Sequence, residues 1–392
     1  MNISSHDKQR IIAETFTARF GDRKHKIMVR SPGRINLIGE HTDYNEGFVL
    51  PAAIDRAIWF AVAPRGDEEF HFVAADLHDE FACSQNAIRK SSKAWPNYLL
   101  GVLEQIKKSG HELRGCEVVF GGDVPIGAGL SSSAAIEAGF AFALNTIFAL
   151  GFEGLQLVRL AQKAENEFVG VQCGIMDQFV NIFGQEKKVL RLDCRTLEYE
   201  YFPFEHDEVC FVLCDTGVSR RLSSSEYNVR RGQCETGVAV LRRHQATIQS
   251  LRDVNLALLD QYKNELEPIV YQRCAYVVRE NARVLSACET LLRGDLQTFG
   301  ALMFESHAGL RDQYEVSCRE LDVLVELARD IPGVLGARMM GAGFGGCTLN
   351  LVEKNRLAHF EEVVHAEYQR STGRKARTHV VQPSAGTACA LQ

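Results

Sequence analysis

Short hydrophobic runs dominate the first third of the chain and predict strands. Four of these runs are rich in β-branched and aromatic residues and end at glycine, proline or charged residues, which is typical of strands. They are residues 26–39, 47–54, 57–65 and 69–75. Residues 95–110 show the apolar spacing of a helix, and residues 115–125 return to the strand pattern. The first part of the chain is therefore predicted to mix helices and strands.

Helical patterns continue through the middle of the chain and return in its second half. Small residues predict a long helix over 131–150, and apolar spacing predicts another over 155–170. Strands are expected at residues 179–184, 188–194 and 208–216. Three further helical segments follow before the chain returns to strand, at residues 227–244, 273–292 and 318–330. No segment has the composition of a linker, and the boundary is therefore inferred from the order of the predicted helices and strands. We predict two α+β lobes, residues 1–205 and 206–392.

Composition and charge narrow the class of protein. The 392 residues are 46% hydrophobic and 24% charged, enough to bury a sizeable core. The net charge is −6, without a basic block, so we expect a small-molecule partner, no nucleic acid and no membrane. The N-terminus lacks an apolar leader, and Asn145 and Thr146 interrupt the longest apolar stretch. We therefore expect a cytoplasmic monomer without an obligate protein partner.

The twelve cysteines are interpreted as reduced thiols of the core, because the chain shows no secretory signal. None lies in a Cys-x-x-Cys pair with the spacing of a zinc site. Cys210 and Cys214 come nearest, but they lie in an apolar run that predicts a buried strand.

A glycine- and serine-rich segment is the first candidate binding site. In "GGDVPIGAGLSSSAA", a strand exit is followed by flexible Gly127 and Gly129 and by three serines that open a helix. A helix start offers unpaired N–H groups and positive partial charge, which favour phosphate. The alternative is an ordinary loop with a serine cap. The Walker pattern is absent, so charge compensation for a bound nucleotide must come from elsewhere, and we expect a metal.

A second glycine-rich segment, "GAGFGG" at residues 341–346, matches a dinucleotide-binding fingerprint. That fingerprint needs a helix after it, whereas residues 347–354 alternate like a strand. We therefore predict a tight turn that allows close approach of a ligand or a neighbouring element. A purely structural turn is the alternative.

Several polar residues are candidates for chemistry. Asp177 lies among apolar residues, where an isolated carboxylate would be costly, so it is either a general base partnered by Arg34 or a structurally paired or capping residue. Glu165 is either a solvated helix residue or a magnesium ligand acting with Ser133. The segment "GEHTDYNEG", residues 39–47, crowds hydrogen-bonding groups in a way that fits a polyol site.

Four motifs together resemble the galactokinases of the GHMP kinase superfamily: "GRINLIGEHTDYNEGFVLP", "PIGAGLSSSAA", "CGIMDQF" and "MGAGFGGC", in this order. The resemblance implies an α+β fold of two lobes with the active site in the cleft between them. The N-terminal lobe would be of the ribosomal protein S5 domain 2-like type, and the C-terminal lobe also α+β. It also implies transfer of the γ-phosphoryl group of ATP to the C1 hydroxyl of α-D-galactose.

The same resemblance implies roles for single residues. Asp177 would accept the proton of the C1 hydroxyl, with Arg34 stabilising charge, and Ser133 and Glu165 would bind Mg²⁺. The adenine would lie near Trp95. The residues expected to bind the ATP phosphates are Gly127, Ala128, Gly129, Leu130, Ser131, Ser132 and Ser133. Those expected to bind galactose are Glu40, His41, Thr42, Asp43, Gly174 and Tyr227.

Two alternatives stay open at this stage. A kinase for a related sugar such as N-acetylgalactosamine would share the chemistry, although Thr42 and Asn45 favour galactose. The chain also carries Asp215-Thr216-Gly217 where many galactokinases have a turn rich in Asn and Ser, which bears on selectivity. A non-catalytic sensor of galactose and ATP is disfavoured by the intact serine segment and by the presence of Arg34 and Asp177.

Overall fold

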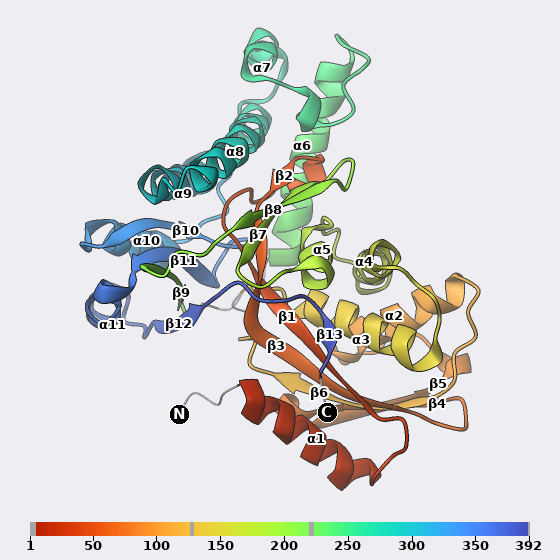
Figure 1. Ribbon diagram of the computed structural model, residues 1–392. Helices are drawn as coiled ribbons and strands as arrows, with labels where there is room; N and C mark the ends of the chain where they lie inside the picture. Colours follow the sequence, from red (N-terminus) through yellow and green to blue (C-terminus); the bar gives the residue numbers. More distant parts are fainter. Residues whose placement is uncertain (1–4, 126–128, 219–222, 391–392) are drawn as a thin grey trace.

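The computed structural model describes residues 5–125, 129–218 and 223–390, which form two α+β lobes (Figure 1). The N-terminal lobe is built on a six-stranded sheet with the order β13-β1-β3-β6-β4-β5, antiparallel except between β4 and β6. Its strands are β1(Ile27–Asn36), β3(Pro51–Pro64), β4(Glu69–Ala74), β5(Asp79–Ser84), β6(Cys116–Gly122) and β13(Ala388–Cys389). The edge strand β13 comes from the end of the chain, so the last residues return to the N-terminal lobe.

Helices cover both faces of this sheet. On one face lies α1, whose Ile12 and Phe16 are buried against the sheet (Figure 1). On the other, α3 packs so closely that a Cβ added at Gly139 would lie 2.5 Å from the Cβ of Ser31. The small residues of α3 thus bring its start close to β1. The helices of this lobe are α1(Ser5–Phe20), α2(Pro96–Lys108), α3(Ser132–Phe148), α4(Gly154–Lys163) and α5(Met176–Phe183).

One predicted strand of this lobe is wrong. Of residues 179–184, expected to be extended, 179–183 belong to helix α5 and Gly184 is its C-cap. Met176, Phe179, Val180 and Phe183 are spaced i, i+3, i+4 and i+7, so one helical face is apolar, and the first three are buried. A short run of β-branched and aromatic residues hid this period. The neighbouring prediction at 188–194 is confirmed by β7 in a three-stranded sheet of β2(Phe48–Val49), β7(Lys188–Asp193) and β8(Tyr199–Pro203).

The C-terminal lobe is built on an antiparallel sheet with the order β10-β11-β9-β12. Its strands are β9(Val209–Asp215), β10(Val334–Met339), β11(Cys347–Glu353) and β12(Arg377–Val381). Its helices are α6(Ser223–Arg242), α7(Leu256–Gln261), α8(Pro268–Leu292), α9(Leu296–Asp312), α10(Arg319–Asp330) and α11(Leu357–Thr372). The tight turn predicted at residues 341–346 is confirmed, because it joins β10 to β11.

Short helical turns complete the fold. One of them is a π-helix, η4(Ala164–Val169), in which the helix predicted over 155–170 widens after α4. The others are the 3₁₀ turns η1(Asp43–Asn45), η2(Ala75–Leu77), η3(Gln85–Ala87), η5(Leu251–Asp253), η6(Lys263–Glu265) and η7(Lys354–Arg356).

One hydrophobic cluster spans the two lobes. Phe211 of β9 and Val284 of α8 belong to the same buried cluster as Ile35 and Leu50 of the N-terminal lobe. The boundary near residue 205 falls between β8 and β9 and stays a prediction. All twelve cysteines are free thiols, and Cys210 and Cys214 lie in the predicted buried strand, β9. Among the helices of the described residues, none combines the length and the apolar character needed to cross a membrane.

Candidate active site

A cleft of about 490 Å³ lies between the lobes and gathers most of the residues singled out in the sequence. One wall is the segment 39–47, here called the polar loop, and the opposite wall is the segment 129–133, here called the serine loop. The lining residues of the N-terminal lobe are Arg34, Glu40, His41, Asp43, Tyr98, Gly129, Ser131, Ser132, Ser133, Glu165, Val171, Cys173, Gly174, Met176 and Asp177. The C-terminal lobe adds Tyr227, Gly341 and Ala342.

Arg34 and Asp177 form a bidentate ion pair in this cleft. A bulge in β1 between Pro32 and Arg34 turns the arginine toward the start of α5. There its Nε and Nη2 donate to the two oxygens of Asp177, each at 2.8 Å. The arginine side chain is 6% exposed and the aspartate side chain 25%, so ligands can reach the carboxylate more readily than the guanidinium. Burial would lower the pKa of Arg34, but the charges of Asp177 and Glu40 raise it. The guanidinium is therefore a fixed positive charge.

The serine loop is joined to this ion pair. Arg34 donates to the carbonyl of Gly129 at 2.5 Å through Nη1, and its backbone N–H donates to the carbonyl of Leu130 at 3.1 Å. Ser131 begins helix α3 in a left-handed conformation, with φ 59°. Its hydroxyl donates to Asp177 Oδ2 at 2.6 Å and does not cap the helix. The ordinary serine cap considered from the sequence is therefore wrong.

Most of the residues expected to bind phosphate line the cleft. Gly129, Ser131, Ser132 and Ser133 lie at its surface, next to the N-terminus of α3. Leu130 is 1% exposed, so only its backbone contributes to the loop. Gly127 and Ala128 lie outside the described residues.

Glu165 reaches the cleft from the π-helix. The N–H groups of Gly170 and Val171 both donate to its carbonyl, at 2.9 and 3.2 Å, which ends the wider turn. Its carboxylate accepts from Gln178 Nε2 at 2.8 Å and from the Cys173 thiol at 3.3 Å. Burial, together with the charge of Asp177, raises the pKa of Glu165. π-Turns of this kind are frequent at functional sites, and the sequence pattern did not show this one.

Glu137 is a second buried carboxylate that sequence reasoning missed. It lies one turn after Ser133 in α3 and is fully buried. Neither of its oxygens has a well-aligned hydrogen-bond donor in the described part of the chain. Burial and the nearby charge of Glu165 raise its pKa well above the usual range. The carboxyl oxygens of Glu137 lie near Glu165 and Ser133, and all three residues offer oxygen ligands. Mg²⁺ prefers oxygen ligands, so these residues fit the expected metal.

Binding of Mg²⁺ at Ser133 and Glu165 would need further oxygen ligands from a bound phosphate. Within the described ranges, no cluster of three or more His, Cys, Asp or Glu side chains is arranged to hold a metal ion by itself. Ser133 and Glu165 offer one hydroxyl and one carboxylate, and both line the cleft. Mg²⁺ commonly binds one or two protein oxygens together with substrate phosphates and waters. The serine loop beside these two residues provides the place for such phosphates.

The polar loop presents acceptors to the other side of the cleft. Glu40 accepts from the N–H of Gly341 at 2.7 Å, which joins it to the turn between β10 and β11. Burial, and then the negative charge of Asp177, raise the pKa of Asp43 to about 7. A Cβ added at Gly174 would lie 1.9 Å from Asp43 Oδ2, so glycine is required there.

Two further predicted site residues, Thr42 and Trp95, do not line the cleft, and their roles stay predictions. The Thr42 hydroxyl is buried and lies within hydrogen-bonding distance of the carbonyls of Gly39, at 2.8 Å, and Phe48, at 2.6 Å, so it shapes the polar loop from inside. Trp95 donates from its indole N–H to Asp79 Oδ2 at 3.0 Å. Tyr98, three residues further along the same segment, lines the cleft instead. The helical spacing of α2 did not show which aromatic residue faces inward.

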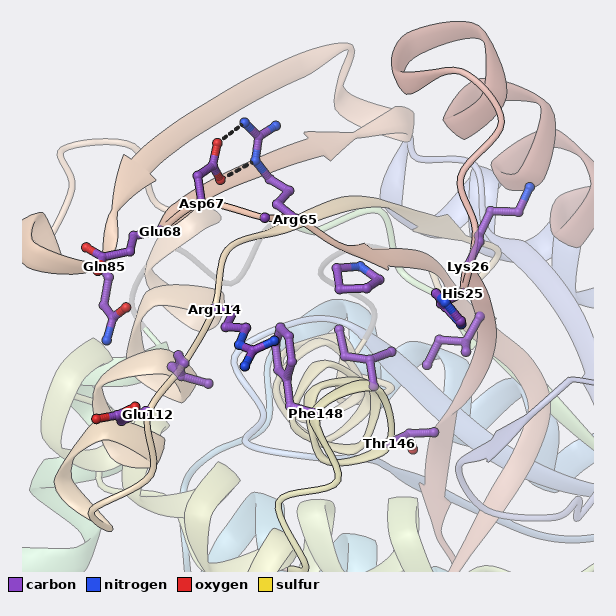
Figure 2. Close-up of a pocket in the computed structure, with 15 residues that line it drawn as sticks. His25, Lys26, Arg65, Asp67, Glu68, Gln85, Glu112, Arg114, Thr146 and Phe148 are labelled. Atoms are coloured by element: carbon purple, nitrogen blue, oxygen red, sulfur yellow. Dashed lines mark hydrogen bonds and ion pairs between the residues drawn. The ribbon is translucent and has the colours of Figure 1, made fainter.

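A larger cavity than the cleft lies elsewhere and is not a convergent site (Figure 2). It measures about 1180 Å³ and shares no lining residue with the cleft. Its charged residues carry both signs, and Arg65 is bound in a bidentate pair to Asp67 at 2.8 and 2.6 Å. Arg114 and Phe148 also line this cavity (Figure 2). The smaller cleft, where carboxylates, a guanidinium and a helix start converge, is the candidate active site.

Comparison with protein families first gives the class. Three family models match separate parts of the chain. They are the galactokinase galactose-binding signature at residues 14–64, the GHMP kinase N-terminal domain at residues 97–185 and the GHMP kinase C-terminal region at residues 287–370. Mevalonate kinase from Methanococcus jannaschii has the same fold, with a TM-score of 0.65 at 17% identity over 92% of this chain and 99% of that one. The fold and the cleft are those of a GHMP kinase, as expected from the sequence.

Similarity to individual proteins narrows the class further. The galactokinase of Roseiflexus sp. (strain RS-1) is 45% identical over 96% of this chain and 95% of its own length. That of Chloroflexus aggregans is 42% identical over 96% and 97%. The crystal structure of Lactococcus lactis galactokinase complexed with galactose has a TM-score of 0.93 at 37% identity, covering 97% of this chain and 99% of that one. This chain belongs to the galactokinase family, and the resemblance stated from its motifs is confirmed.

Proposed function

We propose that the protein transfers the γ-phosphoryl group of ATP to the C1 hydroxyl of α-D-galactose, giving galactose 1-phosphate and ADP. The observation that carries this proposal is the Arg34–Asp177 ion pair, which lies between the serine loop and the polar loop. A sugar held by the polar loop and a nucleotide held by the serine loop would therefore meet at this pair. Phosphoryl transfer asks a protein mainly for such positioning and for compensation of charge.

In this mechanism Asp177 receives the proton of the C1 hydroxyl. Arg34 holds the carboxylate at both oxygens and is 6% exposed, so the base has one orientation. The same guanidinium reaches the Gly129 carbonyl at the edge of the serine loop. Its charge is thus placed to stabilise the oxygens of the phosphoryl group during transfer. A positioned base of this kind contributes roughly 10²- to 10⁴-fold to the rate.

The nucleotide phosphates would lie against the serine loop at the start of α3. Gly129, Ser131 and Ser132 offer backbone or hydroxyl groups, and the helix start favours negative charge. Ser133 and Glu165 would hold Mg²⁺, and buried Glu137 adds carboxyl oxygens behind them. When bound, the ion neutralises charge on the phosphate oxygens. We also propose a cytoplasmic location, because twelve free thiols are typical of a reducing compartment.

The sugar would lie against the polar loop. Glu40 and Asp43 offer charged acceptors for hydroxyl groups, and His41 and Tyr227 complete the polar surface of that wall. Gly174 brings its backbone close to Asp43 because it has no side chain. Thr42 acts indirectly, by holding the loop from inside.

The test is an ADP-release assay with magnesium-ATP across galactose, N-acetylgalactosamine, glucose, arabinose and galacturonate, with the phosphate position read by phosphorus NMR. We expect strong preference for galactose and a phosphate on C1. Preference for another sugar would keep the mechanism and overturn the proposed specificity. Absence of turnover with all five sugars, while galactose and ATP still bind, would overturn the proposed reaction.

A further inference from the structure

A chain of hydrogen bonds leads away from the cleft and crosses from one lobe to the other. His41 Nδ1 lies 2.8 Å from the Tyr44 hydroxyl, and that hydroxyl lies 2.7 Å from the hydroxyl of Tyr314. Tyr314 continues the chain to the Cys234 thiol at 3.3 Å. The first two residues belong to the polar loop, whereas Tyr314 follows α9 and Cys234 lies in α6. The polar loop is therefore connected to the C-terminal lobe through side-chain hydroxyl and thiol groups.

The far end of this chain is fixed in place. Tyr314 and Cys234 are both fully buried. Arg230 donates from Nε to the Tyr314 carbonyl at 2.8 Å. Arg273, which is 1% exposed, donates to the Gln313 carbonyl and to the carboxylate of Glu315 at 2.6 Å. Two arginines thus clamp the backbone on both sides of Tyr314, so its hydroxyl has a defined position.

The near end is also constrained. His41 has a left-handed backbone, with φ 63°, and its carbonyl accepts from Asn45 Nδ2 at 2.9 Å. Its ring packs against those of Tyr314 and Tyr227, with centroids 4.8 and 5.5 Å away. Ring packing restricts the plane of the imidazole but does not decide which nitrogen carries the proton. The hydrogen bond between Nδ1 and the Tyr44 hydroxyl favours one of the two tautomers.

The chemistry of the four groups gives the chain a direction. Burial raises the pKa of Tyr44 and Tyr314 well above the usual range, and it raises the pKa of Cys234 to about 11, so all three keep their protons at neutral pH. A phenol is a better donor than a neutral imidazole, an imidazole nitrogen is a better acceptor than a phenol oxygen, and sulfur is a weak acceptor. The favoured order runs from Cys234 through Tyr314 and Tyr44 to His41. Nδ1 then accepts, and the proton lies on Nε2.

We propose that Tyr44 and Tyr314 are positioning residues that fix the ring and the Nε2–H tautomer of His41, which then donates a hydrogen bond to a substrate hydroxyl oxygen. The charged neighbours Glu40 and Asp43 only accept when ionised. A hydroxyl that accepts from His41 and donates to a carboxylate uses both of its hydrogen-bonding roles. The proposed class of ligand group is therefore a hydroxyl and not an ether or carbonyl oxygen. The contact with substrate rests on the proposed function, but the tautomer does not.

The first experiment measures the tautomer in the ligand-free protein. The full chain is labelled with ¹⁵N-histidine, the ring nitrogens are observed by long-range proton–nitrogen correlation, and His41 is assigned with His41→Gln. We expect the neutral Nε2–H form with an accepting Nδ1. In Tyr44→Phe we expect that preference to be lost, because Nδ1 no longer has its donor. An Nδ1–H form in the unchanged protein, or the same spectrum in Tyr44→Phe, would overturn the proposal.

The second experiment measures steady-state kinetics of the phenylalanine variants, which keep each ring and remove only its hydroxyl. We expect the galactose KM to rise about tenfold in Tyr44→Phe and about threefold in Tyr314→Phe, with the ATP KM unchanged. Tyr368→Phe is the matched control, because its buried hydroxyl donates to the Thr216 carbonyl at 2.9 Å, apart from the chain.

The two experiments separate this proposal from the assignment of the reaction. Unchanged galactose KM in both variants, or an equal rise in Tyr368→Phe, would overturn a positioning role for the chain. If galactose were not a substrate of the unchanged protein, the proposed reaction would be wrong. The NMR measurement of the His41 tautomer would still test whether the hydrogen-bond chain fixes that ring.

Discussion

The polar loop and the serine loop face each other across the cleft, but different parts of the molecule hold them. The polar loop is held from the C-terminal lobe by three side chains of α8, those of Tyr276, Glu280 and Asn281, which bond to its backbone and to the N–H of Phe48. The serine loop is held within its own lobe, through Arg34 and Asp177.

This difference suggests that the serine loop depends on one lobe alone, whereas the shape of the polar loop depends on both lobes. The serine loop, where we propose that phosphate binds, is built of backbone and short side chains and needs only the local geometry of one lobe. A sugar wall needs side chains with defined directions, and here the packing of two lobes sets them. Substitutions in the C-terminal lobe should therefore change the sugar KM before the ATP KM, and four predictions test the difference between the two loops.

The largest effect is expected where the two walls meet. Asp177→Ala removes the proposed base and should lower kcat about 10³-fold while leaving galactose binding measurable, because the polar loop keeps its own contacts. Initial rates and isothermal titration with galactose check this. A variant with the rate of the unchanged protein would show that Asp177 is not the base.

The next effect should come from Glu280, which is fully buried and accepts from the N–H of Gly39 at 2.9 Å and the hydroxyl of Ser306 at 2.6 Å. Burial would raise its pKa, but the charges of Arg283 and Arg338 lower it, so it is a paired carboxylate. Glu280→Ala should lower the free energy of unfolding by about 3–5 kcal/mol, because it removes the ion-pair partner of Arg283, whose side chain is 12% exposed, and the acceptor of the Gly39 N–H. The galactose KM should rise about tenfold, with the ATP KM unchanged.

Denaturant unfolding and steady-state kinetics measure these two effects of Glu280→Ala. Glu289→Ala, on the exposed face of the same helix, is the control and should change the free energy of unfolding by less than about 0.5 kcal/mol. Equal rises in both KM values would contradict the division of labour between the two walls.

On the nucleotide side, Ser133→Ala and Glu165→Gln should each raise the magnesium concentration for half-maximal rate by about tenfold, since each weakens one expected ligand. The galactose KM should stay unchanged. Glu167→Gln is the control, because this residue of the same π-helix bonds to Gln105 and Lys108 instead. Unchanged magnesium titrations in both variants would move the metal to another site.

The smallest effect concerns stability and pH. The pKa of Asp43 is about 7 in the folded protein and 3.8 in its ordinary state, so its contribution to stability is complete below pH 3.8 and is lost as the pH rises through 7. Asp43→Asn should therefore raise the free energy of unfolding by about 1–2 kcal/mol at pH 8, allowing for partial solvent screening. The gain should shrink as the pH falls toward 4. Denaturant titrations at several pH values check this, and a gain that did not depend on pH would contradict the assignment.

Local patterns were enough to predict several features of the cleft. The serines before a small-residue helix, the glycine turn before a strand and the pairing of Arg34 with Asp177 all lie where the sequence placed them. Each depends on helix starts, strand alternation or the cost of an isolated buried charge, which act over a few residues or one pair. The strand expected at 179–184 was wrong because eight residues carry too short a period to distinguish helix from strand.

The sequence by itself determined the elements, the polar and serine segments and the family to which they belong. Only the tertiary structure decided which side chains face the cleft, with the Thr42 hydroxyl turned inward and Tyr98 among the lining residues. It also decided what holds the polar loop, because Gly39 and Glu280 are 241 positions apart, and Tyr44 and Tyr314 are 270 apart. Contacts of this kind produce no repeating pattern in the sequence of either segment, because they depend on how the two lobes pack against each other.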